Sequence, residues 1–322
     1  MKKLNFDDLV TSRLVQMRRH DTLPLTLYKY HRKVFYRGLF EQDERLRYAR
    51  GIVLDDDGNV IVRPFYKIYN YTENGAGTDW LDSDTVYAVR KRNGFMLCAT
   101  RYNNEVLYTS TGTFDSDYVR LGKSIVEKHV DVNQFLENRT YIFEVCHESD
   151  PHIIQENCEL YLIGVCSVYS NSNWPLIDCL NYEYDSISLQ PNLWTSGFGV
   201  DDYVMMTFGQ LKSVVKNVTH EGFVVYRLED NAEVRESMIK IKTPYYLTTK
   251  FLTRAKKRLY NEDGSIKVKY AKQYLDEEYY DLIEYISHNH STFGLYDEQE
   301  RIRCVREFVN SQWEYCYENL ET

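Results

Sequence analysis

Short hydrophobic runs separated by turn signals fill residues 1 to about 245, and this pattern predicts β-strands. The runs ARGIVLD and NVIVRPF flank an Asp-Asp-Gly-Asn turn. GFMLCATRY and EVLYTST flank Asn103-Asn104, a pair that tolerates the positive φ of a tight hairpin. TYIFEVCH and LYLIGVCSV are typical of a further buried pair of strands. The first part of the chain is therefore predicted to form antiparallel sheets.

The rest of the chain follows a helical period. Hydrophobic residues recur at helical spacing near the C-terminus, at Ile302, Val305, Phe308, Val309, Trp313, Cys316, Tyr317 and Leu320. Asp297 and Glu300 precede this run and are spaced as a capping box. The segment YAKQYLDEEYYDLIEYI predicts another helix. We expect an α+β fold with a sheet domain over residues 1–245 and a small all-helical domain over residues 246–322.

Composition and charge narrow the class of protein. The 322 residues are 43% hydrophobic and 15% aromatic, which is enough to form buried hydrophobic cores. The net charge of −9 argues against a protein that coats nucleic acid nonspecifically. The stretch from Lys240 to Lys272 is nevertheless rich in lysine and arginine and holds only two acids, Glu262 and Asp263. It is a candidate track for a polyanion, and a solvated helix face is the alternative.

The N-terminal segment, the longest apolar run and the spacing of the cysteines bear on the cellular compartment. The N-terminus MKKLNFDDL has no apolar segment of a secretory signal, and the run from Leu160 to Tyr169 is about half of what a membrane-spanning helix needs. The seven cysteines are scattered and never form a CxxC pair. We expect a cytoplasmic protein with reduced thiols and no membrane attachment.

Four segments place charged residues inside or at the end of apolar strands. These residues are Lys91, Glu144, Glu221 and the pair Lys240 and Lys242. A buried charge costs several kcal/mol unless it is paired. A single charged residue in an apolar strand can simply face solvent. Four such segments in one chain indicate a functional site.

Two of these segments are predicted to pair as a hairpin that closes around Asn231 and Ala232. In the predicted register Glu221 lies opposite Lys242, and Phe223 lies opposite Lys240. Both lysines then point to one face, because strand side chains have a period of two. Two ammonium groups beside a carboxylate suit a triphosphate bound with a divalent metal.

Lys91 is the candidate nucleophile, because Asn93 and Gly94 follow it and glycine lets a ligand approach the backbone closely. An amine with an ordinary pKa of about 10.4 is almost fully protonated at pH 7. We therefore expect a lowered pKa for Lys91, with Lys240 and Lys242 helping to lower it.

The order of these motifs, a lysine with Asn-Gly, a strand glutamate, EGFVVY and then KIK, resembles the covalent nucleotidyltransferase superfamily of DNA ligases, RNA ligases and mRNA capping enzymes. The resemblance covers about residues 45–245, and within the superfamily it extends to the type-1 RNA ligases of T-even bacteriophage. It implies an adenylyltransferase domain in which Lys91 attacks the α-phosphate of ATP and carries AMP, with Gly94 closing the motif.

The resemblance also implies the remaining roles. Glu144 would contact the ribose, Glu221 would serve the catalytic metal, Mg²⁺ or Mn²⁺, and Lys240 and Lys242 would hold the phosphates. YARGIVLD and VRPFYKIYN are similar to segments that precede the nucleophile in this ligase type. The resemblance implies that Arg50 and Lys67 reach phosphates and that Tyr69 lies in the adenine pocket.

The implied function is an ATP-dependent RNA ligase that joins 5′-phosphate and 3′-hydroxyl ends through lysyl-AMP and AMP-capped RNA, in RNA repair. The resemblance is compatible with tRNA as a substrate and with a polynucleotide kinase-phosphatase that prepares the RNA ends. If the source is viral, the protein would act in the cytoplasm of the host. The helical C-terminal region of this chain is shorter than that of the phage enzymes, so a tRNA preference stays open.

Two positions differ from the family pattern. Thr111 stands where the family has a lysine, so a phosphate contact is absent or comes from elsewhere, with Arg101 as the candidate. Asp276, Glu277 and Glu278 fall where the phage enzymes have an acidic cluster, for which a solvated helix face is the alternative.

Two alternative functions remain. One is a DNA ligase, although DNA ligases continue after the KxK pair into an OB-fold whereas this chain continues into helices. The other is a ligase fold that has lost catalysis and binds RNA ends. Cys146, His147, His152 and Cys158 match no zinc spacing and are assigned no role.

Overall fold

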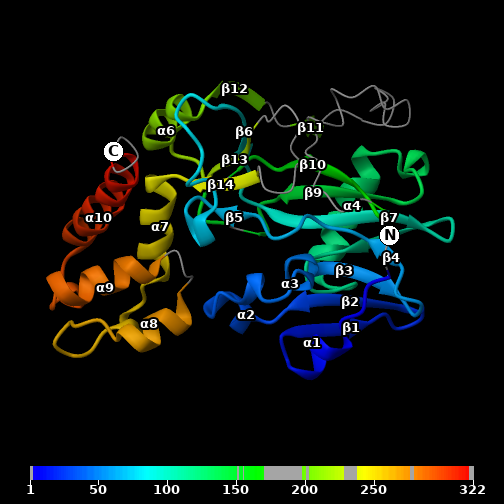
Figure 1. The fold of residues 1–322 in the computed structure, drawn as a ribbon, viewed down its shortest axis with the longest axis horizontal. Coiled ribbons are helices and arrows are strands. Elements are labelled where there is room, and N and C mark those ends of the chain that lie inside the picture. The colour runs from blue at the N-terminus through cyan, green and yellow to red at the C-terminus, as the bar shows by residue number, and fades with distance from the viewer. Residues whose placement is uncertain are drawn as a thin grey trace.

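The computed structural model has an α+β fold, and it describes residues 3–150, 152–154, 156–169, 198–200, 203–227, 238–275 and 279–318. Within these ranges the chain forms an N-terminal sheet, two central sheets and a C-terminal group of helices (Figure 1). Most neighbouring strands are antiparallel, as predicted, and two pairs are parallel. These are β10 (Glu159–Ser167) with β11 (Phe198–Val200), and β14 (Met238–Lys242) with β5 (Tyr69–Asn70).

The N-terminal sheet has the strand order β1-β2-β3-β4 and is antiparallel throughout. Its strands are Val15–Arg19, Leu25–Tyr30, Arg50–Asp55 and Val60–Val62. Short helices cover one face, namely α1 (Asp7–Thr11), α2 (Arg32–Tyr36) and α3 (Arg45–Tyr48). The predicted β3–β4 turn is confirmed: Asp55 accepts hydrogen bonds from the backbone of Asp57 and Asn59, and Gly58 has a φ of 80°.

The second sheet has the order β11-β10-β9-β7-β8. Its strands are Phe198–Val200, Glu159–Ser167, Arg139–Cys146, Phe95–Tyr102 and Glu105–Thr109. Asn103 and Asn104 turn the β7–β8 hairpin with φ values of 52° and 64°, and β9 pairs with β10, so both predictions are confirmed. Helix α4 (Asp117–His129) packs on this sheet through Val119 and Val126.

The third sheet has the order β12-β6-β13-β14-β5. Its strands are Tyr203–Thr207, Thr85–Lys91, Gly222–Arg227, Met238–Lys242 and Tyr69–Asn70. Helix α6 (Phe208–Asn217) covers one face, where Leu211 and Val215 contact a core that includes Ile239 and Ile241. The alternate residues of β14, Lys240 and Lys242, therefore point to the other face.

The predicted register of the β13–β14 hairpin is wrong by one residue. Gly222 lies opposite Lys242 and Val224 opposite Lys240, while the backbone of Glu221 pairs with Thr243. Gly222 has a φ of 146°, and a Cβ there would lie 2.0 Å from the carbonyl oxygen of Ile241, so only glycine fits this position. The predicted turn at Asn231 and Ala232 lies outside the described residues.

The C-terminal helices share a core of their own. They are α7 (Pro244–Arg254), α8 (Val268–Tyr274), α9 (Tyr280–Asn289) and α10 (Glu298–Glu318). The core includes Phe251, Leu282 and Val305. The capping box of α10 is confirmed, because Asp297 and Glu300 each accept a hydrogen bond from the other's backbone nitrogen. Leu320 lies outside the described residues.

The single helix predicted for residues 270–286 is wrong. Leu275 has an extended backbone with a ψ of 163°, which ends α8, and α9 begins at Tyr280. Asp276, Glu277 and Glu278 lie outside the described residues.

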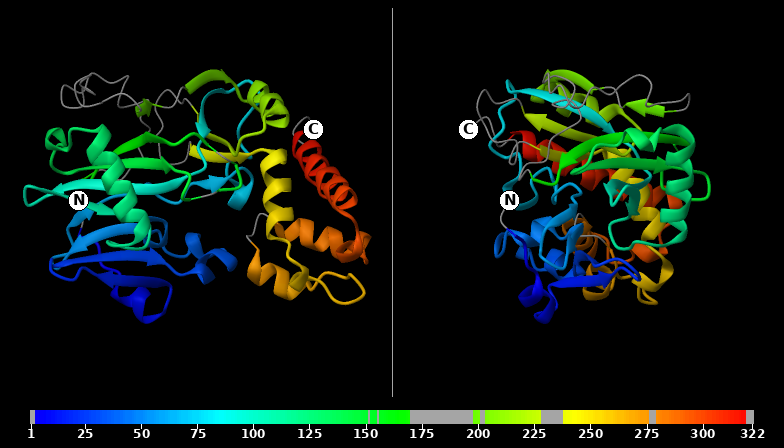
Figure 2. Two further views of the ribbon diagram at one scale, coloured as in Figure 1. Left: turned by 180° about the vertical axis from the view of Figure 1, so that it is seen from behind. Right: turned by 90° about the vertical axis from the view of Figure 1, so that its right-hand side faces the viewer.

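A shared core joins the N-terminal sheet to the central sheets. Leu27 and Val53 of the N-terminal sheet lie in one cluster with Ile142 of β9 and Met238 of β14. Figure 2 shows the N-terminal sheet, in blue, against the central sheets, with the C-terminal helices at one end. Within the described residues no helix is long and apolar enough to cross a membrane.

Candidate active site

Lys91 and Lys242 lie in one row across three strands of the third sheet. Lys91 is the last residue of β6, Gly222 of β13 lies opposite it, and Lys242 of β14 lies opposite Gly222. Residues in one cross-strand row share a face, and Gly222 puts no side chain between the two lysines. Lys240 lies in the next row on this face, beside Asn70 of β5. The structure therefore brings together the predicted nucleophile and both predicted phosphate ligands.

Lys91 makes an ion pair with Glu221. Its Nζ lies 2.9 Å from Oε2 of Glu221, whose side chain is 5% exposed, and it also donates to the carbonyl oxygen of Arg92. Burial by itself lowers the pKa of Lys91, but the carboxylates of Glu221 and Glu144 outweigh burial and raise that pKa above its ordinary value. The expectation of a lowered pKa for Lys91 is therefore wrong. Lys242 does lower this pKa, but the two carboxylates raise it by more.

Glu144 holds the loop that follows the nucleophile. Its Oε1 accepts a hydrogen bond from the backbone nitrogen of Gly94 at 3.1 Å. A Cβ at Gly94 would lie 2.3 Å from the carbonyl oxygen of Val145, so the approach of this loop to β9 requires glycine. Burial raises the pKa of Glu144, while Lys91 and the Gly94 N–H oppose that rise.

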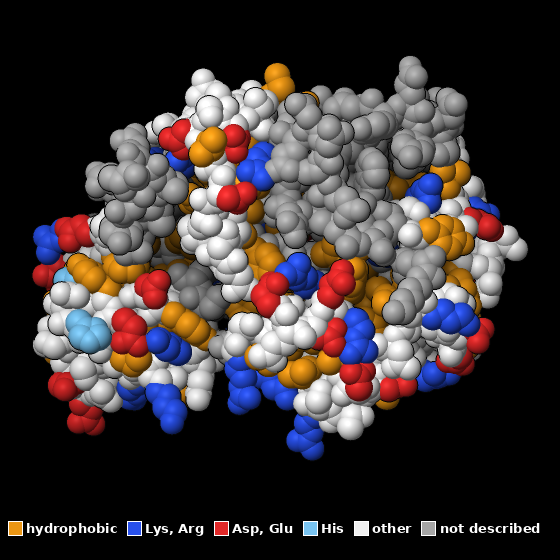
Figure 3. Space-filling model, in the orientation of Figure 1, with side chains coloured by type: hydrophobic (Ala, Val, Ile, Leu, Met, Phe, Trp, Pro, Cys, Tyr) orange, Lys and Arg blue, Asp and Glu red, His pale blue; other side chains and the backbone are white. Residues whose placement is uncertain are grey.

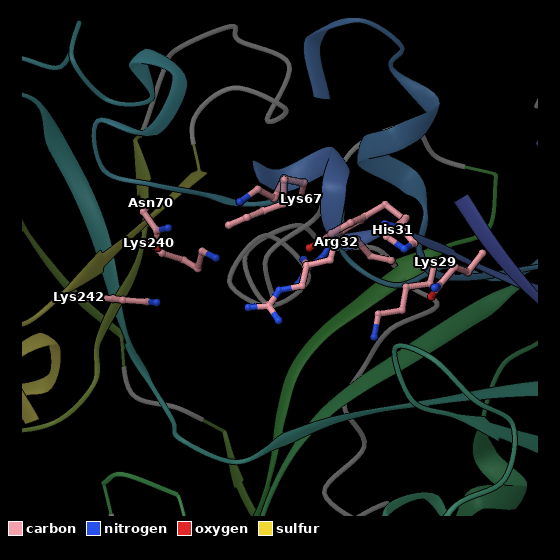
Figure 4. A pocket seen from close by; sticks show the side chains of 11 residues that line it. Lys29, His31, Arg32, Lys67, Asn70, Lys240 and Lys242 are labelled. Carbon is pink, nitrogen blue, oxygen red and sulfur yellow. The ribbon is translucent and has the colours of Figure 1, made fainter. Parts of the chain in front are cut away.

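A cavity of about 450 Å³ lies between the N-terminal sheet and the third sheet. Among the described residues that line it, six are cationic and none is acidic; the cations are Lys29, Arg32, Arg50, Lys67, Lys240 and Lys242. Figure 4 shows the amines of Lys240 and Lys242 on one side of the cavity and the guanidinium of Arg32 facing them from the other. The pKa of Lys240 lies well below its ordinary value, mainly because its amine is buried. The positive charges of Lys67, Lys242 and Arg50 lower this pKa further. Such a concentration of like charge suits a polyanion.

Arg50 and Lys67, both predicted to reach phosphates, line this cavity. Arg50 donates from Nη1 to the carbonyl oxygen of Tyr66 at 2.9 Å, which fixes its guanidinium. Lys67 pairs with Glu73 at 2.6 Å, and its side chain is 4% exposed. Both cations are therefore held in place before any ligand binds.

Tyr69 does not line the cavity. Its hydroxyl donates to Oε1 of Glu41 at 2.7 Å, and the Nζ of Lys67 lies 5.0 Å from the centre of its ring. Phe40 meets the same ring edge-on. The structure thus gives Tyr69 a packing role, and its contact with adenine stays a prediction.

Arg101 does not replace the lysine that the family has at Thr111. Its Nη1 donates to the carbonyl oxygen of Asn133, and it is absent from the cavity lining. The Thr111 backbone packs tightly on the N-terminal sheet instead, because a Cβ at Gly51 would lie 2.9 Å from the Cα of Thr111.

Several residues near the site were missed by sequence reasoning. Lys29 and Arg32 line the cavity, and the basic run YKYHRK around them was the available signal. Buried Glu156 lies 2.8 Å from Arg90 and 3.5 Å from Arg92, the two neighbours of the nucleophile. No sequence pattern places Glu156 there, because it comes from a loop before β10.

The side chains present fit a divalent ion only in part. Among the described residues no group of three or more His, Cys, Asp or Glu side chains converges. The carboxylate of Glu221 is a hard oxygen ligand of the kind that Mg²⁺ prefers, and phosphate oxygens commonly complete such a shell. Glu221 together with a bound triphosphate would therefore hold the ion.

Comparison with known proteins agrees with this geometry. A family profile described as RNA ligase matches residues 48–246. A search of curated protein sequences gave no significant match.

The fold is similar to that of solved ligases. A putative ATP-dependent DNA ligase from Aquifex aeolicus has a TM-score of 0.55 at 14% identity, with 95% of this chain and 77% of that chain covered. An archaeal ATP-dependent RNA ligase has a TM-score of 0.55 at 12% identity, with 96% and 76% covered. A second form of the archaeal ligase gives the same TM-score at 11% identity and the same coverage.

The family profile spans more than half of the chain and contains the Lys91 row, Glu144, Glu221 and both cavity lysines of β14. The chain belongs to the RNA ligase family.

Proposed function

We propose that this protein is an ATP-dependent RNA ligase that carries AMP on Lys91 and seals RNA 5′-phosphate ends to 3′-hydroxyl ends. The observation that carries the proposal is the row of Lys91 and Lys242, with Glu221 2.9 Å from the Lys91 amine and the cationic cavity beside it. A nucleophilic amine next to a triphosphate-sized cationic cavity suits nucleotidyl transfer.

In the first step the Lys91 ammonium loses a proton, for which Glu221 is the nearest acceptor. The amine forms a bond to the α-phosphorus of ATP and releases its second proton. The bond from that phosphorus to the bridging oxygen breaks, and its electron pair leaves on pyrophosphate. Lys240 and Lys242 stabilise the charge that builds on the phosphate oxygens. A divalent ion, when bound, would neutralise phosphate charge in the same step.

The second and third steps use the RNA ends. An oxygen of the RNA 5′-phosphate attacks the phosphorus of lysyl-AMP, and the Lys91 nitrogen leaves with the electron pair and takes up a proton. The 3′-hydroxyl then attacks the 5′-phosphorus of the AMP-capped RNA, loses its proton, and displaces AMP. One phosphodiester forms, and AMP and pyrophosphate are the products.

The basic stretch after Lys242 is the proposed RNA contact. Tyr270 and Tyr274 of α8 are exposed with parallel rings, and the guanidinium of Arg258 lies 3.8 Å from the centre of the Tyr274 ring. Exposed aromatic rings among cations suit single-stranded nucleic acid. Figure 3 shows Lys and Arg side chains along the lower edge of this face.

We propose residues 1–245 as the adenylyltransferase domain and residues 246–322 as a helical domain that positions RNA. The biological role would be RNA repair in the cytoplasm, with tRNA among the candidate substrates and with a polynucleotide kinase-phosphatase preparing the ends. Glu144 would contact the ribose and Tyr69 the adenine.

The test is incubation with labelled ATP and Mg²⁺, followed by denaturing electrophoresis and mass analysis of the intact protein and of Lys91→Ala. An AMP adduct in the first and not in the second supports the proposal. Supplying 5′-phosphorylated RNA or DNA strands then separates an RNA ligase from a DNA ligase. Absence of any adduct, in protein that is not already adenylylated, would reject the enzyme and favour a protein that binds RNA ends.

A further inference from the structure

Lys29 comes from a different sheet than the other lysines of the cavity. It lies in β2, opposite Arg50 of β3, and both side chains line the cavity that Lys240 and Lys242 line from the third sheet. Figure 4 shows Lys29 at the end of the cavity away from Lys240 and Lys242. The cavity is therefore bounded by cations at both ends.

The Lys29 ammonium also lies against the loop that follows β8. A Cβ built on Gly112 would lie 3.3 Å from the Nζ of Lys29. Arg18 of β1 donates to Oγ1 of Thr113 in the same loop, at 2.6 Å. The loop is thus pressed onto the N-terminal sheet, and Lys29 occupies the space beside a segment, Ser110–Thr113, that has no cation of its own.

Lys29 has no carboxylate partner among the residues that the structure describes. Burial, with a further contribution from Arg50, lowers the pKa of its amine, so its charge is costly where it stands. A half-buried, unpaired lysine that faces a cavity without acids is placed to meet an anion.

The position of Lys29 along the cavity determines which part of the ligand it meets. Lys91 must reach the α-phosphorus, and Lys242 lies in the same row as Lys91. The α-phosphate therefore belongs at the Lys242 end, and the phosphates beyond it extend toward the N-terminal sheet. The terminal phosphates become pyrophosphate when the nucleophile attacks.

We infer that Lys29 binds the terminal phosphates of the nucleotide and the pyrophosphate leaving group, in the place beside the Thr111 loop where the family has a lysine. This inference rests on the proposed function. It assigns Lys29 to the first step alone, because the AMP-capped RNA that enters the third step carries no terminal phosphates.

The experiment compares the full chain with Lys29→Ala and Lys29→Arg. The matched control is Lys33→Ala, because the Lys33 amine donates to the carbonyl oxygen of Ser12 and does not line the cavity. Three quantities are measured: binding of inorganic pyrophosphate by calorimetry, the rate of Lys91 adenylylation at subsaturating ATP, and the sealing rate with a strand that already carries a 5′-AMP cap.

We expect Lys29→Ala to weaken pyrophosphate binding and slow adenylylation about 10- to 100-fold, the usual effect of losing one charge-assisted hydrogen bond. Sealing of the capped strand should stay within about twofold of the original rate, a limit well below the tenfold change that such a bond is worth. Lys29→Arg should recover part of the loss, and Lys33→Ala should change nothing.

Unchanged pyrophosphate binding in Lys29→Ala would overturn the inference. An equal loss of adenylylation and capped-strand sealing would also overturn it, since that result indicates a merely structural lysine. If the original chain forms no AMP adduct, the proposed function fails, yet pyrophosphate binding still decides whether Lys29 is an anion ligand.

Discussion

The amine of Lys91 lies 2.9 Å from Oε2 of Glu221, so the candidate nucleophile is one member of an ion pair. Glu221 and Glu144 together raise the Lys91 pKa against the effect of burial. A paired ammonium is not nucleophilic. Activation of Lys91 must therefore include removal of this pairing, through proton transfer or through a competing cation at Glu221.

Glu221→Gln should lower the pKa of Lys91, because burial and the nearby Lys242 charge then face only the Glu144 carboxylate. The pKa can be measured from the pH dependence of Lys91 acylation by an amine reagent, followed by peptide mass analysis. Glu73→Gln is the control, since Glu73 pairs with Lys67. An unaltered Lys91 pKa in Glu221→Gln would show that the ion pair has no influence on the nucleophile.

Pyrophosphate binding should take up a proton at Lys240. Burial and the neighbouring cations hold the pKa of Lys240 well below its ordinary value, and a bound anion raises that pKa. Between these two pKa values the complex holds more protons than the free protein, so affinity should fall as the pH rises. Calorimetry in buffers of different ionisation enthalpy measures the uptake.

The control for proton uptake is Lys240→Arg, because a guanidinium stays charged throughout this pH range. Its binding heat should be much less dependent on the buffer. Equal buffer dependence in both proteins would assign the proton to another group.

Gly222→Ala should destabilise the fold by about 2–4 kcal/mol, because the new Cβ would meet the Ile241 carbonyl oxygen and force β13 and β14 apart. The control is Gly38→Ala, at a φ of 60° with open space around it, which should cost about 1 kcal/mol for backbone strain alone. Urea denaturation gives both values. Equal costs would mean that strand contact at Gly222 is unimportant.

Charge reversal of Lys256, Lys257 and Arg258 should weaken RNA joining and flatten its dependence on salt, since each lost phosphate contact reduces the logarithmic salt slope by about 0.7 for a single strand. The control reverses Lys123 and Lys128 of α4 on the second sheet. Joining rates are measured over a series of salt concentrations. If joining and its salt slope are unchanged, this basic stretch does not contact RNA.

Local sequence patterns predicted most of the fold. The Asn103-Asn104 hairpin, the β9–β10 pair and the capping box on Asp297 and Glu300 each depend on neighbouring residues, and each was confirmed. The break after Leu275 was missed because the hydrophobic period continues across it. The hydrophobic periodicity of a sequence indicates which residues face a core, but it does not indicate where the backbone turns.

The site was predictable in its residues but less so in its geometry. The predicted hairpin register was wrong by one residue, so the partner of Lys242 is Gly222 and not Glu221. The sequence does not show how closely the backbones of β13 and β14 approach each other at this position. The Lys91 pKa was predicted from the lysines of the KIK motif, while the carboxylates that raise it come from β9 and from the residue before β13. Lys29 lies in the basic run YKYHRK, but this run does not show that its side chain faces the third sheet, since that depends on the packing of one sheet on another.

Acidic side chains are absent among the described residues that line the cavity, and this has a thermodynamic consequence. Like charges held together by the fold repel one another, which costs free energy, and a bound polyanion offsets that cost. A ligand at 100 times its dissociation constant adds about 2.7 kcal/mol to the stability of the folded state. Purification in phosphate buffer or in amine buffer would then yield protein of measurably different melting temperature, and nucleotide supply would help to set how much of the chain stays folded.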